Sequence, residues 1–207
     1  MALSALEVHT LKLAPAVEGV LPVVLHRWSS RAFSDRAVSD ADLHRSFEAA
    51  RWSPSAYNEQ PWRFVVGRQG SATHKAIFES LIGFNQEWAG RAPVLILGVA
   101  RSTFSHNGAA NAYALYDLGA ATALLTLQAA ELGLTSHQMA GFDHDKARKL
   151  LAIPEDYLLG AAIALGYQGD PAALTNERLQ ELEITPRSRK PLNELVFDAW
   201  GTSAHLG

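Results

Sequence analysis

Hydrophobic positions along the chain switch between helical spacing and short continuous apolar runs, a pattern typical of proteins that mix helices and strands. A helix is predicted after Ser39, whose hydroxyl suits an N-cap, and Pro54 closes that segment. A second helix is predicted over residues 72–82, stopped by Gly83, and a third follows Asp143, another N-cap residue.

The longest helical pattern runs from about residue 109 to residue 132 and is apolar on nearly all sides. Gly133 follows it in the position that favours a left-handed cap. A helix without a polar face needs cover all round, so we expect neighbouring elements or a partner subunit to bury it. Its weakly charged part, between Asp117 and Glu131, is shorter than the roughly 20 residues of a bilayer span.

Three apolar runs predict buried strands. Residues 94–99, rich in β-branched and apolar types, form the clearest one, and residues 64–66 and 158–165 are two others. Residues 187–197 have no clear period, although residues 195–197 could pair at a sheet edge. Helices and strands in this order predict an α+β fold around a small buried sheet, whose topology stays open.

Chain length indicates the number of domains, and net charge bears on nucleic-acid binding. A chain of 207 residues is long enough for one domain with a sizeable core, so we expect a single domain over residues 1–207. Residues 1–24 would be an N-terminal extension and residues 186–207 a tail. The net charge of −3 argues against a general nucleic-acid binder.

The chain contains no cysteine, which removes disulfides, iron–sulfur clusters, Cys-bearing zinc sites and thiol chemistry. Its histidines are scattered and form no HExxH motif, so no metal site is expected. Glu7, His9, Lys12 and Glu18 interrupt the early apolar residues. No signal peptide is therefore predicted, and we expect a soluble cytoplasmic protein.

Two clusters of cationic and hydroxyl groups suit a phosphate. Arg27, Ser29 and Arg31 present two guanidinium groups and a hydroxyl within five residues, and Arg187 and Arg189 lie near the end of the chain. Guanidinium matches phosphate oxygens bidentately. Taken alone, the first cluster could instead be a solvated basic turn and the second a charged tail. A nucleic-acid arm would bind only weakly on an acidic protein.

The loop at residues 54–62 is more specific. Two prolines restrict its backbone, which lowers the entropy cost of holding its polar groups in place. Ser55, Asn58 and Gln60 offer donors and acceptors suited to the edge of a flat heterocycle, beside the apolar ring of Trp62. The alternative is an ordinary turn capped by Asn and Ser.

Several other signals are absent or weak. No GxSxG, GxxxxGK or GxGxxG motif occurs, so the chain is not recognisable as a serine hydrolase, a P-loop NTPase or a Rossmann dehydrogenase. His137 either lines a pocket or is a hydrogen-bonded loop histidine.

Taken in order and spacing, these fragments resemble the nitroreductase family of FMN-dependent NAD(P)H oxidoreductases over residues 27–201. Each motif alone is moderate support, and their joint occurrence in order is strong. The matching positions are Arg27, Ser29, Arg31 and Phe33, then Pro54, Ser55, Asn58, Gln60, Pro61 and Trp62, then Asn85 ahead of Ala92 and Pro93, then residues 116–119, 132–134, 141–143 and 186–189.

The resemblance implies a three-layer sandwich in which helices flank a central mixed or mostly antiparallel sheet. It also implies an intertwined homodimer with FMN sites shared across the interface, and a tail that contacts the partner. The residues it assigns to cofactor binding are Arg27, Trp28, Ser29, Arg31, Pro54, Ser55, Asn58, Gln60, Asn85, Met139, Ala140, Gly141, Arg187 and Arg189.

Within that set the resemblance distributes roles. The arginines and Ser29 would hold the phosphate and ribityl end of FMN, and Asn85 would bond the flavin or its ribityl chain. Backbone N–H groups around Ala140 and Gly141 would face the flavin N5, and the loop at residues 54–58 would come from the partner subunit. In some members a lysine stands where this chain has Trp88 and a glutamate where it has Ala140, which leaves substrate and nicotinamide preference open.

The implied activity is a ping-pong oxidoreduction. NADH or NADPH would pass a hydride to flavin N5 and leave, and a small acceptor such as a nitroaromatic, quinone or conjugated enal would then be reduced. No side chain need act as a strong acid or base. A reductive dehalogenase on the same scaffold, a non-catalytic flavin-binding sensor and a protein–protein module without flavin are the alternatives.

Overall fold

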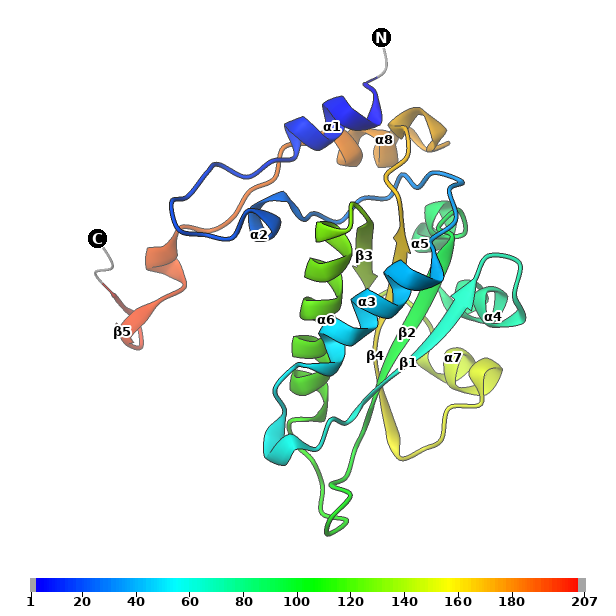
Figure 1. Cartoon of the computed structure of the whole chain (residues 1–207), viewed down its shortest axis with the longest axis vertical. Coiled ribbons are helices and arrows are strands. Elements are labelled where there is room, and N and C mark those ends of the chain that lie inside the picture. Colours follow the sequence, from blue (N-terminus) through cyan, green and yellow to red (C-terminus); the bar gives the residue numbers. More distant parts are fainter. Residues whose placement is uncertain (1–2, 205–207) are drawn as a thin grey trace.

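The computed structural model describes residues 3–204, and a four-stranded antiparallel sheet lies at its centre (Figure 1). The strands are β1 (Trp62–Arg68), β2 (Val94–Arg101), β3 (Thr135–Met139) and β4 (Tyr157–Gly166), in the order β1-β2-β4-β3. The three apolar runs became β1, β2 and β4, so these predictions are confirmed.

Two layers of helices enclose this sheet. Helices α3 (Asp40–Arg51) and α6 (Ala114–Glu131) cover one face, and α4 (Ala72–Ser80), α5 (Gly83–Ala89) and α7 (His144–Leu151) cover the other (Figure 1). Side chains alternate along β2: Leu95 and Leu97 belong to the core under α4, α5 and α7, and Val94 and Ile96 to the core under α3. The three-layer α+β sandwich is therefore confirmed.

The predicted caps are in place. The Ser39 hydroxyl accepts the N–H of Asp42 at 3.0 Å, and the Asp143 carboxylate accepts the N–H of Lys146 at 2.9 Å. Gly133 has φ +77°, the left-handed conformation that ends α6. Such signals are readable in advance because the cap and the groups it satisfies are neighbours in sequence.

Three boundaries differ from the predictions, and in each case a β-pairing that the local pattern does not reveal lies at the boundary. The long helix begins at Ala114, not near residue 109, because Ala110 forms a β-bridge with Thr103. Gly83 does not simply stop a helix; α4 ends at Ser80, Leu81 bridges to Phe142, and Gly83 begins α5.

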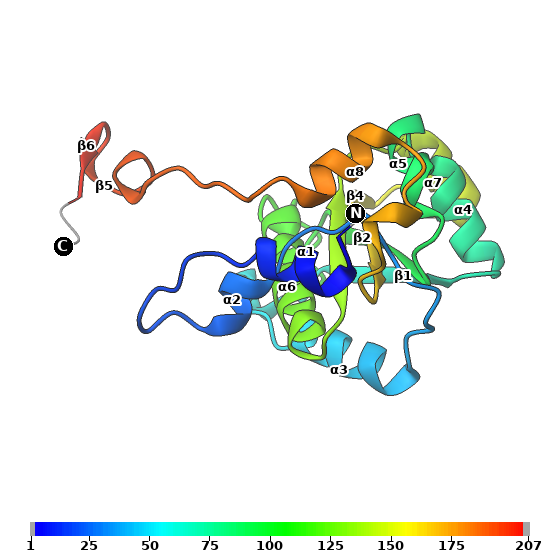
Figure 2. The same cartoon turned by 90° about the horizontal axis from the view of Figure 1, so that it is seen from above.

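The third difference lies in the tail. Strand β5 (Phe197–Ala199) pairs with β6 (Thr202–Ser203) in a separate hairpin and not with the edge of the central sheet. Figure 2 shows this hairpin at the far end of an extended tail, away from the sheet. Phe197 therefore makes no pairing with β1 to β4.

Strand β3 was not predicted. Its sequence contains Ser136, His137 and Gln138 and shows no apolar run. It is an edge strand whose backbone pairs with β4, with Met139 opposite Ala162. An edge strand packs less of its side-chain surface and tolerates polar residues. Residues 135–139 therefore lack the apolar run from which a strand is predicted.

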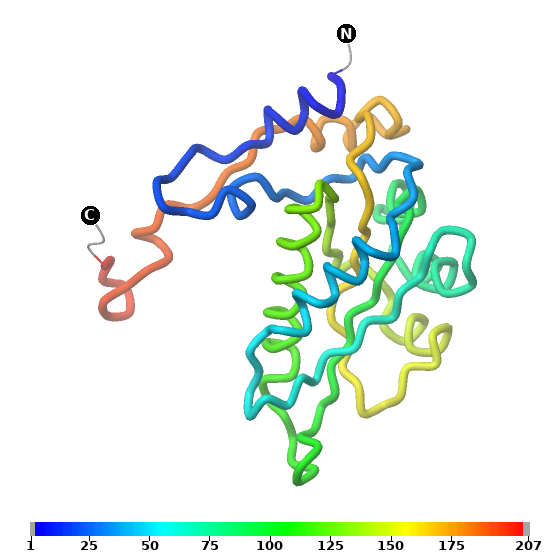
Figure 3. The backbone as a smooth tube through the Cα atoms, in the orientation of Figure 1, coloured from blue at the N-terminus to red at the C-terminus, as the bar shows by residue number. Residues whose placement is uncertain are grey.

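Short helices occupy the terminal segments: α1 (Ala5–Leu11), α2 (Pro22–His26) and α8 (Glu177–Ile184), with 3-10 turns η1 (Ala56–Asn58), η2 (Pro171–Ala173) and η3 (Leu192–Glu194). Helices α1 and α8 lie side by side in both views (Figures 1 and 2). The tube in Figure 3 shows the segments that follow α1 and α8 leaving the body on the same side. Within residues 3–204, no helix is long and apolar enough to cross a membrane.

Candidate functional site

The two cationic clusters meet in space although they lie at opposite ends of the sequence. They line one cavity of about 200 Å³ between the segment after α2 and the segment after α8. The lining residues are Lys12, Arg27, Trp28, Ser29, Arg31, Leu182, Arg187 and Arg189. The residues that were expected at a phosphate are therefore gathered around one hollow, which we call the cationic cavity.

A buried carboxylate holds the segment after α2 that lines one side of the cationic cavity. Glu183 is 0% exposed and accepts hydrogen bonds from three donors of the passing segment: the Ser30 side-chain hydroxyl at 2.6 Å and the backbone N–H groups of Arg31 and Ala32, each at 3.0 Å. These bonds hold the residues between Ser29 and Ala32 against α8. Sequence reasoning missed Glu183, although it lies one turn after the equally buried Leu179 on the same helix face.

Arg187, in the segment after α8, bonds the segment at the end of α2, on the other side of the cavity. Its Nη1 donates to the carbonyl oxygen of Arg27 at 2.7 Å, and its Nη2 to that of Leu25. Arg187 therefore shapes the cavity as well as lining it, a role that was not expected. Among residues 3–204, the buried Nε atoms of Arg31 and Arg187 have no hydrogen-bond acceptor.

The cationic cavity fits a phosphate group. Burial lowers the pKa of Arg27, and the charge of Arg189 adds to that effect. Burial also lowers the pKa of Arg187, followed by the charges of Arg189 and Arg27. Because arginine stays protonated, these shifts reflect first the cost of burying the guanidinium groups and second their mutual repulsion, and a bound anion offsets both. The guanidinium groups and the Ser29 hydroxyl that line the cavity match its oxygens.

A second part of the expected site forms where α5 meets the end of β3. The Asn85 side chain donates from Nδ2 to the carbonyl oxygen of Gly141 at 2.9 Å, and the Ile82 N–H donates to the same oxygen at 3.1 Å. A Cβ atom on Gly141 would lie 2.7 Å from Ile82 Cδ1 and 2.8 Å from Asn85 Nδ2. A side chain at position 141 would therefore push the ends of the Ile82 and Asn85 side chains aside. Met139 is buried beside it, and Ala140 is exposed.

Strand β3 connects the two parts. His137 lies two residues before Met139, and its Nδ1 is 3.1 Å from the Ser30 carbonyl oxygen, which places an Nδ1–H donor there. Burial, and then the charge of Arg31, lowers the pKa of His137 to about 4, so its ring is neutral at pH 7. The ring also packs 4.6 Å from that of Trp88, which is 1% exposed in the core.

The loop at residues 54–62 has a defined shape but lies away from the cationic cavity. Figure 1 shows it at the opposite end of α6 from α2, so one chain does not bring Pro54, Ser55, Asn58 or Gln60 to the cationic cavity. Buried Asp117 on α6 accepts the Ala56 N–H at 3.1 Å.

Hydrogen bonds inside this loop fix its shape. The Ser55 hydroxyl accepts the Gln60 N–H at 3.0 Å, and the Gln60 side chain donates to the Asn58 carbonyl oxygen at 3.1 Å. Tyr57, Asn58 and Gln60 all have positive φ, at 53°, 54° and 49°. Three non-glycine residues in this strained region are typical of a functional loop that its surroundings hold in place.

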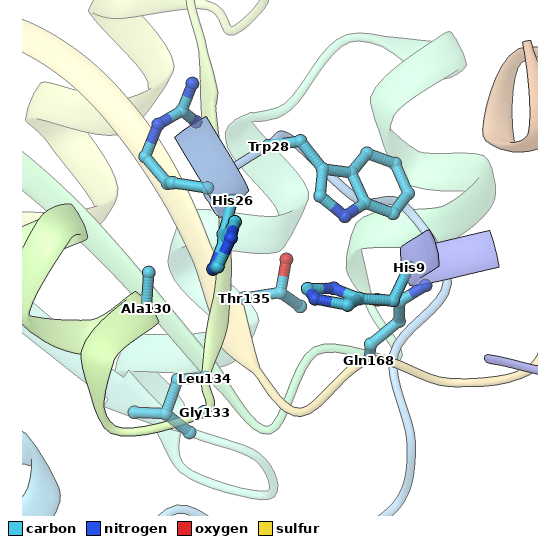
Figure 4. Close-up of a pocket in the computed structure, with 9 residues that line it drawn as sticks. His9, His26, Trp28, Ala130, Gly133, Leu134, Thr135 and Gln168 are labelled. Carbon is cyan, nitrogen blue, oxygen red and sulfur yellow. The ribbon is translucent and has the colours of Figure 1, made fainter. Parts of the chain in front are cut away.

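A smaller cavity of about 90 Å³ lies beside Arg27, which also lines it. His9, His26, Trp28, Thr135 and Gln168 surround it (Figure 4). Within the described chain, no group of three or more potential metal-ligating side chains occurs.

Known proteins are similar to this chain in sequence and fold. The family model described as "Nitroreductase family" matches residues 24–85 and 74–167. A putative NADH dehydrogenase/NAD(P)H nitroreductase of Archaeoglobus fulgidus is 31% identical over 158 residues, which cover 74% of this chain and 88% of that protein. An NADH dehydrogenase of Thermus thermophilus is 30% identical, with 87% of this chain and 99% of that protein covered.

A solved structure described as an oxidoreductase containing FMN superposes with a TM-score of 0.83 at 35% identity, covering 92% of this chain and 97% of that one. The matched family region includes Arg27, Arg31, the loop at residues 54–62, Asn85 and Gly141, while Arg187 and Arg189 lie beyond it. This chain therefore belongs to the nitroreductase family.

Proposed function

We propose that this protein is an FMN-dependent oxidoreductase that transfers hydride from NADH or NADPH to a small organic acceptor such as a nitroaromatic, quinone or conjugated enal. The observation that carries the proposal is the cationic cavity, which Arg27, Arg31, Arg187 and Arg189 line together. The FMN named for the structural relative supports the same cofactor here.

Each part of the site has a role in this proposal. Arg27, Ser29, Arg31 and Arg189 bind the phosphate, and Arg187 both lines the cavity and braces it. Asn85 and the backbone N–H groups of Ala140 and Gly141 bind the flavin. The chemistry that bound FMN supplies is relay of a hydride from the nicotinamide to the acceptor in a ping-pong sequence. Trp28 and Met139 complete the apolar surroundings.

We also propose a homodimer in which Pro54, Ser55, Asn58 and Gln60 reach the partner's cofactor. This loop is rigid yet far from its own cationic cavity, as Figure 1 shows. The outer face of α6 is uncovered in one chain, with Tyr116 77% exposed. The tail extends from the body and ends in a hairpin whose Trp200 is 96% exposed. Exposed aromatic surface of this kind is typical of an interface.

Deleting residues 192–207 tests the dimer, because it removes the extended end of the tail and keeps Arg187 and Arg189. We expect the full chain to have the mass of a dimer by light scattering at micromolar concentration. The deletion should raise the dimer dissociation constant by at least about tenfold, since it removes the exposed apolar hairpin. A monomeric full chain would overturn the homodimer, and an equally stable deleted dimer would overturn the role of the tail.

The activity is tested by the visible absorbance of protein that has been incubated with FMN, desalted and mixed anaerobically with NADPH or NADH. We expect retained flavin that bleaches with a nicotinamide and recovers when a nitroaromatic or quinone is added. Retained flavin that neither nicotinamide bleaches would favour a non-catalytic sensor. Recovery only with a halogenated aromatic would favour reductive dehalogenation. Protein that retains no flavin would overturn the proposal.

A further inference from the structure

The cationic cavity contains a lysine that the nitroreductase motifs do not include. Lys12 follows α1 in the N-terminal extension, is 4% exposed, and lines the cavity with the arginines. Buried lysines are rare without a specific partner. Among the described residues, however, Lys12 forms no ion pair with a carboxylate.

The hydrogen bonds of Lys12 use two of its three N–H donors. Its ammonium donates to the carbonyl oxygens of Leu182 at 3.0 Å and Thr185 at 2.5 Å, at the end of α8. An ammonium has three N–H donors, so these two bonds leave one. The group also lies 4.8 Å from the ring centre of Trp28, another residue that lines the cavity.

The placement of Lys12 is built into the fold. Helix α1 begins with a capping box, in which the Ser4 N–H donates to the Glu7 carboxylate at 2.8 Å, and Lys12 is its C-cap residue. Val8, 0% exposed, is buried on this helix, which packs along α8. The ammonium is therefore carried into the cavity by a docked helix.

We propose that Lys12 is a further phosphate-binding residue, which helix α1 delivers into the cationic cavity by docking on α8. The proposal rests on the assignment of FMN to this site. Burial lowers the pKa of Lys12, Glu183 opposes that shift, and the charges of Arg31 and Arg187 add to it. A phosphate monoester, with a charge of about −1.5 to −2, offsets this repulsion.

Lys12→Gln tests the proposal, because glutamine removes the charge but keeps N–H donors for the end of α8. FMN and riboflavin differ only by the phosphate, so titrating both ligands isolates its contribution. We expect the dissociation constant for FMN to rise about 10- to 100-fold, the loss of one charge-assisted hydrogen bond, with that for riboflavin unchanged within about twofold. Lys149→Gln, an exposed lysine on α7, is the matched control and should alter neither constant.

A second measurement needs no flavin. Inorganic phosphate should raise the melting temperature of the unliganded wild-type protein and of Lys149→Gln, and raise that of Lys12→Gln clearly less. Lys12→Met, which keeps only the apolar stem, should behave like Lys12→Gln; if either variant does not fold, the other carries the test. Equal losses of FMN and riboflavin affinity, or no loss of either, would overturn the role of Lys12. A wild type that binds neither flavin would instead overturn the FMN assignment.

Discussion

Replacing Glu183 by alanine is expected to destabilise the protein by about 3–5 kcal/mol, the range for breaking a buried charged network. The substitution leaves the N–H groups of Arg31 and Ala32 without their acceptor beside the buried position 183, whereas the Ser30 hydroxyl keeps the Ala32 carbonyl oxygen at 3.1 Å. Each buried donor without a partner costs about 1–3 kcal/mol. Urea denaturation of the unliganded protein measures the change in the free energy of unfolding.

Two variants sharpen this experiment. Glu181→Ala, at an exposed position on the same helix, should change the free energy of unfolding by no more than about 0.5 kcal/mol. Glu183→Gln should lie in between, because its amide oxygen still accepts while its NH2 group faces the N–H donors. If Glu183→Ala is no less stable than Glu181→Ala, the carboxylate does not hold the segment that carries Arg31.

The double substitution Arg27→Ala plus Arg189→Ala is expected to abolish FMN retention through a desalting column. Two charge-assisted contacts at about 1.5–3 kcal/mol each correspond to an affinity loss of roughly 10²- to 10⁴-fold. The fold should survive, because Arg187 contacts only the backbone oxygen of Arg27, and the Arg189 side chain bonds only its neighbour Ser188 among the described residues. Flavin absorbance per protein after desalting is the measurement.

The matched control is Arg45→Ala plus Arg51→Ala on α3, which removes the same charge from two side chains that are 60% and 58% exposed. That protein should keep the full flavin complement of the wild type. If the Arg27 and Arg189 double variant also purifies with a full complement, the phosphate is bound elsewhere. Riboflavin affinity separates a lost phosphate contact from a disturbed ring site, since only the former spares riboflavin.

The features that the sequence determined by itself are local ones. Ser39 and Asp143 begin helices, and Gly133 ends one, because each satisfies backbone groups or a φ value within a few residues of itself. Residues 94–99 form a central strand because a short apolar run with β-branched residues is stable only when both faces are covered. The ordered nitroreductase motifs likewise indicated the family without any coordinates.

The tertiary structure decided what depends on distant partners. Strand β3 exists because β4 pairs with its polar sequence, and α4 ends at Ser80, where Leu81 bridges to Phe142. Glu183 and Lys12 look like ordinary charged residues in the sequence. Burial against the segment around Arg31 gives Glu183 a bracing role, and docking of α1 on α8 places Lys12 in the cavity. Burial and partner geometry set the energy of a charge, and neither is a property of its sequence neighbours.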